Sequence, residues 1–96
     1  MRLVFNPNAK SDLEQIGDYI ARDNPDAAIA FVGRLRDRCR QIAQFPGIGR
    51  RRSDLMSGYR SLAEGQYVIL YLVLSDKVEI ARILHGKQDL RKALKE

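Results

Sequence analysis

The dipeptide Asn-Pro occurs twice within the first 25 residues, at Asn6-Pro7 and Asn24-Pro25, and each occurrence marks a helix start. Asn caps the free amides of a first helical turn, and Pro suits the first helical position because its missing N–H has no partner there. Apolar residues follow each signal at helical spacing. The two series are Ala9, Leu13, Ile16 and Ile20, then Ala28, Phe31, Val32, Leu35, Cys39 and Ile42. Because only a short connection separates them, the two helices are predicted to form an antiparallel hairpin.

Four further segments have the composition of strands. They are Arg2–Phe5, Tyr59–Ala63, Tyr67–Leu74 and Lys77–Leu84. Short turns separate the last three, which predicts an antiparallel three-stranded meander. Residues 46–58 form a loop dense in Gly, Arg and Ser, and Gly86–Glu96 has the apolar spacing of a short C-terminal helix. Residues 1–96 are therefore predicted to be one α+β domain: an N-terminal strand, a helical hairpin, the meander and a short helix.

The segment Tyr67–Leu74 is apolar on both of its alternating faces. A strand that helices cover on one side only should alternate between apolar and polar residues. Two explanations stay open: a curved sheet whose second face is partly covered by the C-terminal segment, or a surface that a protein partner covers. The pattern favours a protein that works with a partner.

Composition excludes several classes of function. The longest unbroken apolar run, Tyr67–Leu74, is far short of the roughly 20 residues that span a bilayer. The first residues lack the apolar core of a signal peptide, so we expect a cytoplasmic protein. One cysteine and one histidine exclude a structural zinc site, and no glycine-rich phosphate loop occurs, so we expect neither metal nor cofactor. Cys39 belongs to the apolar series of the second helix and is interpreted as a core residue.

The net charge of +5 is unevenly distributed. Residues 34–60 carry net +6 and residues 82–96 net +3, whereas residues 1–33 and 61–81 each carry net −2. Twelve of the 17 cations are arginine, whose planar guanidinium suits carboxylate and phosphate partners. For a single arginine a solvated surface is the simpler explanation, but the clustering predicts an anionic macromolecular partner.

His85 is the single candidate for a general acid or base near neutral pH. Together with Arg60 and Arg82 it can be read as a minimal ribonuclease site, in which arginines grip a phosphodiester and histidine protonates the leaving oxygen. The alternative is a histidine that ends a strand and hydrogen-bonds to its own turn. We favour the alternative because a nuclease usually needs a base as well as an acid.

Five segments carry a resemblance to a known family. They are Asn24–Ala28, Phe45–Arg50, Gly58–Arg60, Val68–Tyr71 and Ala81–Leu90. In this order they resemble the ParE branch of the RelE/ParE toxins of bacterial type II toxin–antitoxin systems, whose fold has the element order expected above. The resemblance implies a small toxin that a co-expressed, ParD-like antitoxin wraps and silences. ParE members typically inhibit DNA gyrase by trapping its cleaved DNA complex, whereas RelE members are ribosome-dependent endoribonucleases.

The C-terminal segment favours the ParE branch, because Gly86 follows the histidine and a charged tail extends to Glu96. We therefore expect a non-enzymatic gyrase inhibitor. Its expected target-binding residues are Arg60, Arg82, His85, Lys87 and Arg91. The expected antitoxin-binding residues are Tyr19, Arg34, Arg38, Tyr59 and Tyr71, on apolar surfaces of the sheet and beside the hairpin. The alternative is a RelE-like, ribosome-dependent mRNA endoribonuclease in which Arg60, Arg82 and His85 are catalytic; a basic DNA-binding module ranks last.

Overall fold

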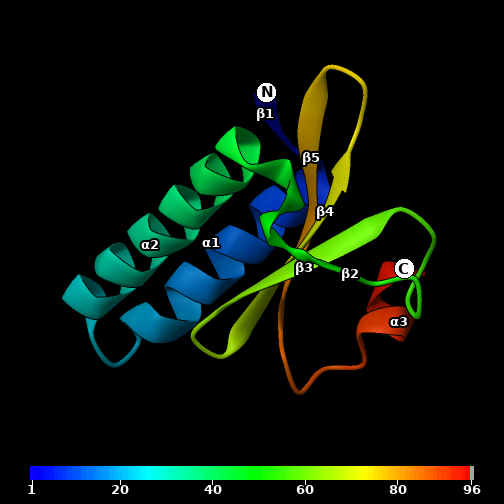
Figure 1. The fold of residues 1–96 in the computed structure, drawn as a ribbon. Helices are drawn as coiled ribbons and strands as arrows, with labels where there is room; N and C mark the ends of the chain where they lie inside the picture. The colour runs from blue at the N-terminus through cyan, green and yellow to red at the C-terminus, as the bar shows by residue number, and fades with distance from the viewer. Residues whose placement is uncertain (96) are drawn as a thin grey trace.

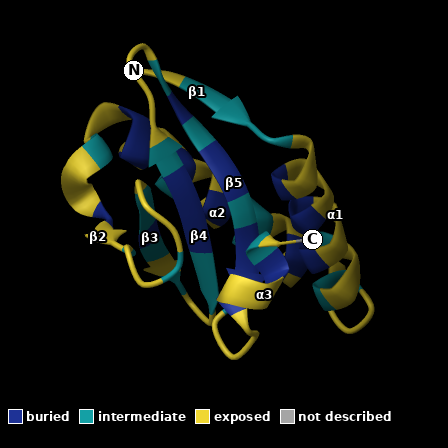
Figure 2. Ribbon diagram, turned by 90° about the vertical axis from the view of Figure 1, so that its right-hand side faces the viewer, coloured by how far each residue is buried: buried dark blue, intermediate teal, exposed yellow. Residues whose placement is uncertain are grey.

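Helices lie on both faces of one mixed five-stranded sheet (Figures 1 and 2). The computed structural model describes residues 1–95, so Glu96, the end of the predicted tail and domain, lies outside the described residues. The helices are α1 (Pro7–Ala21), α2 (Pro25–Gln44) and α3 (Leu90–Leu94), with one turn of 3-10 helix at Pro46–Ile48. The strands are β1 (Arg2–Phe5), β2 (Arg50–Arg51), β3 (Tyr59–Glu64), β4 (Tyr67–Val73) and β5 (Lys77–His85). The predicted α+β class and its elements are confirmed.

Both long helices begin where the two Asn-Pro signals predict. The Asn6 side chain accepts a hydrogen bond from the backbone N–H of Asn8 at 2.8 Å, and the Asn24 side chain accepts one from Ala27 at 3.0 Å. These bonds satisfy amides of the first turn that have no partner inside the helix. Within residues 1–95, no helix is both long enough and apolar enough to cross a membrane.

The sheet has the strand order β1-β5-β4-β3-β2. Strands β3, β4 and β5 form the predicted antiparallel meander. Strand β1 pairs with β5 in parallel, with Arg2 opposite Lys77 and Phe5 opposite Ile80, so the first strand lies beside the last. The segment predicted as a loop between the hairpin and the meander also contains two short elements, the 3-10 turn and β2.

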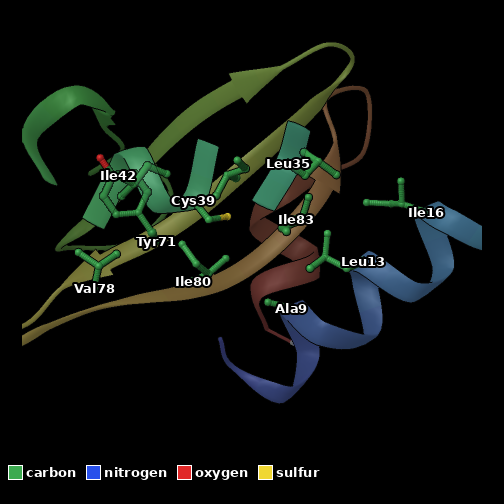
Figure 3. Close-up of a cluster of buried hydrophobic side chains, with 11 residues drawn as sticks. Ala9, Leu13, Ile16, Leu35, Cys39, Ile42, Tyr71, Val78, Ile80 and Ile83 are labelled. Atoms are coloured by element: carbon green, nitrogen blue, oxygen red, sulfur yellow. The ribbon is translucent and has the colours of Figure 1, made fainter. Parts of the chain in front are cut away.

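The sheet is covered by apolar residues on both faces. Between the hairpin and the sheet, the main core contains Ala9, Leu13, Ile16, Leu35, Cys39, Ile42, Ile69, Tyr71, Val78, Ile80 and Ile83 (Figure 3). On the other face, a second cluster contains Leu70, Leu84, Leu90 and Ala93. The doubly apolar strand is therefore explained by the C-terminal segment, because α3 covers the second face of β4. Only its far end is open, where Val73 is 40% and Leu74 is 38% exposed.

Candidate functional site

Arg82 of β5 is bound by residues of two helices. Its Nε and Nη2 donate to the Asp12 carboxylate of α1 at 2.8 and 3.0 Å, and its Nη1 donates to the Ala93 carbonyl of α3 at 3.0 Å. Asp12 is 7% exposed and also accepts the backbone N–H of Ile83 at 2.9 Å, where β5 extends beyond β1. Arg82 therefore joins α1, β5 and α3. Its guanidinium is engaged inside the fold and is not presented to a target.

Arg60 lies on the hairpin side of the sheet, directly opposite Tyr71. Its Nη1 donates to the carbonyl of Gly49 at 2.8 Å. The Tyr71 hydroxyl accepts from the Gly49 N–H at 2.9 Å and donates to the carbonyl of Pro46 at 2.7 Å. Burial raises the pKa of this hydroxyl, and the Gly49 N–H and the Arg60 charge oppose the rise. These bonds fasten the segment between α2 and β2 to the sheet.

His85 ends β5 and is hydrogen-bonded to its own turn. The backbone N–H of Lys87 donates to its Nδ1 at 3.2 Å, and its Nε2 lies 3.2 Å from the Gln66 side-chain oxygen. This pattern assigns the proton to Nε2, because Nδ1 acts as an acceptor. The ring also contacts Tyr67 edge-on, with centroids 5.3 Å apart. The structural interpretation of His85 as a strand-ending residue is confirmed.

The structure does not bring Arg60, Arg82 and His85 together. Strand β4 lies between β3 and β5, and His85 pairs with Tyr67, four residues along β4 from Tyr71, the partner of Arg60. From the rise and spacing of strands, the Cα atoms of Arg60 and His85 lie about 16 Å apart. Each of the three side chains has different partners. As folded here, they do not form the ribonuclease arrangement that the sequence suggested.

Two other predicted target-binding residues lie after β5. Lys87, in the turn that follows the strand, and Arg91, on α3, are both exposed. Arg91 Nη2 donates to the carbonyl of Asp54, which links α3 to the loop between β2 and β3. These two side chains remain available to a partner.

Three of the predicted antitoxin-binding residues lie along the helical hairpin. Tyr19 is 65% exposed. The Arg34 guanidinium lies 5.1 Å from the centre of the Phe31 ring, and its Nε is 3.8 Å from a carboxylate oxygen of Glu64. Arg38 Nε approaches the same carboxylate to 3.1 Å without the alignment of a hydrogen bond. Tyr19 and Arg34 are accessible, and Arg38 is half-buried.

The two remaining tyrosines lie elsewhere. Tyr59 is half-buried against the second apolar cluster, on the α3 side of the sheet. Tyr71 is completely buried in the main core, so it is not available at the surface for an antitoxin. A tyrosine in an apolar strand resembles an interface residue in sequence, but here its hydroxyl has internal partners.

A surface groove on the outer side of the hairpin was not found from the sequence. It has a volume of about 710 Å³ and runs between α1 and α2. Small residues, among them Gly17, Ala21, Ala28 and Gly33, leave the space, and Ile29 beside them is 75% exposed. Glycines within predicted helices were the available signal, because they lower helix propensity without a local reason.

Carboxylates and a guanidinium also border this groove. Glu14 and Asp18 of α1 and Arg36 of α2 lie on its lining, and all three are exposed. The groove therefore combines an apolar floor with charges of both signs, which suits an amphipathic helical segment.

Cys39 is a structural residue of the main core. Burial raises the pKa of the Cys39 thiol to about 12, so the sulfur remains protonated within the core. Among residues 1–95, no group of three or more His, Cys, Asp or Glu side chains is arranged to hold a metal ion.

Comparison with known protein families identifies the family of this chain. Residues 3–90 match the model of the family described as the ParE toxin of type II toxin–antitoxin systems, parDE. The chain belongs to the ParE toxin family.

Two curated toxins are similar to this chain over most of its length. Toxin ParE1 of Caulobacter vibrioides is 36% identical over 84 residues, which is 86% of each chain. Toxin RelE3 of the same organism is also 36% identical, over 83 residues that make up 85% of this chain and 90% of the relative. A chain of a solved structure titled as the chromosomal ParDE system of P. aeruginosa has the same fold. It superposes with a TM-score of 0.77 at 23% identity and covers 91% of this chain and 97% of that one.

Proposed function

We propose that this ParE-family toxin inhibits DNA gyrase by binding the gyrase–DNA complex, and that it does so without catalysing a reaction of its own. The observation that carries the proposal is the separation of Arg60, Arg82 and His85, each held by different internal partners. A nuclease needs its acid, base and phosphate-binding groups within reach of one substrate atom. Membership of the ParE family, whose members typically inhibit gyrase, supports the same target.

A supercoiling assay tests this target directly. Purified toxin is added to gyrase and relaxed plasmid, and cleaved plasmid is measured after protein denaturation. We expect loss of supercoiling with accumulation of cleaved DNA. Unchanged gyrase activity at a large molar excess of folded toxin rules out the target.

The alternative is a ribosome-dependent mRNA endoribonuclease, and the 36% identity to Toxin RelE3 is the observation that favours it. Under this alternative, induction of the toxin produces mRNA cuts that require translation and disappear in His85→Ala. Gyrase activity is then unaffected. Parallel mapping of RNA ends and plasmid supercoiling in the same induced cells separates the two functions.

We propose further that a ParD-like antitoxin neutralises the toxin, in the cytoplasm, through the groove of the hairpin. The similarity to a ParDE system supports a protein partner of this class. An amphipathic antitoxin segment would bury Ile29 and place cationic side chains beside Glu14 and Asp18 and an acidic one beside Arg36. Tyr19 and Arg34 do not line this groove: Tyr19 lines a separate hollow with Phe31 and Tyr67, and Arg34 lies beside Phe31. Their contact with an antitoxin is a separate part of the proposal.

A further inference from the structure

The residues on the α3 side of the sheet share one continuous surface. Arg50 of β2 is paired with Ser61, and Ser61 with Leu70, so the three side chains project from the same face. Leu70 packs against α3, and Arg91 of α3 bonds to the β2–β3 loop through the Asp54 carbonyl. Figure 1 shows this loop beside α3, and Figure 2 shows α3 lying across the sheet.

Exposed cations gather on this surface, which we call the α3 basic face. It consists of Arg50, Lys87, Arg91, Lys92 and Lys95, all of them exposed. Three of the chain's five lysines belong to it. Within residues 1–95, no carboxylate pairs with the ammonium groups of these lysines.

Within residues 1–95, two carboxylates near the α3 basic face, Asp54 and Asp89, already accept hydrogen bonds. Both oxygens of Asp54 accept hydrogen bonds from Arg52 at 3.1 Å, and this contact lowers the pKa of Asp54, so the carboxylate stays charged and paired. Asp89 accepts the backbone N–H of Lys92 at 3.1 Å and caps α3. Among the described residues, the five cations of this face therefore outnumber its one carboxylate without a cationic partner, Asp89.

We propose that the α3 basic face binds the phosphate backbone of DNA. The inference rests on the proposed function, since it assigns this face to the DNA of the gyrase–DNA complex. Lysine is depleted in protein–protein interfaces, whereas Lys and Arg neutralise phosphates in nucleic-acid binding. A duplex is recognised here by charge and not by sequence, because the cations come from a strand edge, a turn and a short helix. The apolar hairpin groove, on the opposite side, remains for a protein.

The test compares two charge-reversal variants with the same change in net charge. Lys92→Glu/Lys95→Glu alters the α3 basic face, and Lys10→Glu/Arg22→Glu alters two exposed positions, one in α1 and one just after it. Binding to a 20-base-pair fluorescent duplex is followed by anisotropy between 50 and 200 mM salt. We expect the first variant to lose about tenfold in affinity at low salt and to lower the slope of log K against log salt by about 2. The second variant is expected to stay within about twofold of the wild type.

A single substitution, Lys87→Glu, provides a second probe outside any helix, and thermal melting checks that each variant folds. Equal losses in both double variants would show that net charge alone drives binding, and absence of duplex binding by the wild type at 50 mM salt would remove the DNA surface. Displacement of the duplex by poly-glutamate at equal charge concentration would assign the face to an acidic protein instead.

The supercoiling assay is scored separately. If duplex binding follows the expected pattern and gyrase is unaffected, the target is wrong and the DNA surface stands.

Discussion

The hydroxyl of Tyr71 connects two parts of the chain that are far apart in sequence. Its partners, Gly49 and Pro46, lie 22 and 25 positions away, and an added Cβ at Gly49 would collide with the Tyr71 side chain. Sequence patterns report local spacing, so they identify the apolar strand but not the partner of this hydroxyl. Sequence patterns do not identify the partner of Arg82 for the same reason, because Asp12 is 70 positions away. Both residues were predicted to contact other proteins, and both are engaged inside the molecule.

We expect Tyr71→Phe to lower the free energy of unfolding by about 1–3 kcal/mol, because it leaves the buried N–H of Gly49 without an acceptor. Urea denaturation measures the change. Tyr19→Phe is the matched control, since Tyr19 is 65% exposed, and it should be neutral within about 0.5 kcal/mol. Equal stability of both variants would contradict the role assigned to the Tyr71 hydroxyl.

The buried thiol of Cys39 predicts a dependence of stability on pH. Its pKa rises from 9.0 to about 12 on folding, so between these values the unfolded chain loses the proton first. Stability is therefore full below pH 9 and falls as the pH rises towards 12, at up to about 1.4 kcal/mol per pH unit. Cys39→Val removes this contribution while other groups still titrate. The unfolding free energy of the wild type minus that of Cys39→Val should become less positive or more negative from pH 9 to pH 11. A constant value of this difference would refute the assignment.

At the scale of elements, the sequence predicts what is decided locally. The caps at Asn6 and Asn24 act within three residues, and they place both helix starts correctly. Strand β2 has two residues and gives no periodicity, so only its pairing with β3 defines it. The hairpin groove was missed for a related reason. Apolar periodicity identifies the buried side of each helix, whereas the groove exists because glycine and alanine at its lining leave space.

Gly33 lines the groove and lowers the helix propensity of α2. No atom lies within 4 Å of a Cβ added there, so Gly33→Ala should raise the free energy of unfolding by about 0.5–1 kcal/mol through helix propensity. At Gly17 an added Cβ would lie 3.4 Å from the Val32 side chain, so Gly17→Ala should gain less. Thermal or urea unfolding of the two variants provides the comparison. Destabilisation by Gly33→Ala would show that the site is more crowded than described.

At the scale of the whole molecule, the sheet separates two surfaces of different chemistry. The apolar groove lies on the outer side of the hairpin, and the α3 basic face lies on the other side of the sheet, where Figure 2 shows α3. The sequence predicted both an apolar and a cationic surface, but not their placement. That placement follows from β4 and β5, which carry the hairpin on one face and α3 on the other.

Ile29 tests whether the groove receives the antitoxin. Ile29→Asp places a charge in the apolar part of the groove without touching the core, because the side chain is 75% exposed. We expect antitoxin affinity to fall at least about tenfold, so gyrase should stay inhibited at antitoxin concentrations that restore supercoiling with the wild-type toxin. Ala30→Asp, an exposed position of α2 that does not line the groove, is the control. Full neutralisation of Ile29→Asp would place the antitoxin elsewhere.

The parallel pairing of β1 with β5 also constrains the time at which the toxin becomes active during its synthesis. Arg2 finds its neighbour only when Lys77 is available, and the strand that organises both faces is the last of the sheet to emerge from the ribosome. Contacts between such distant residues form slowly, because a long loop must close before they are made. The complete sheet, and any surface built on it, therefore forms only when almost all of the chain has been translated.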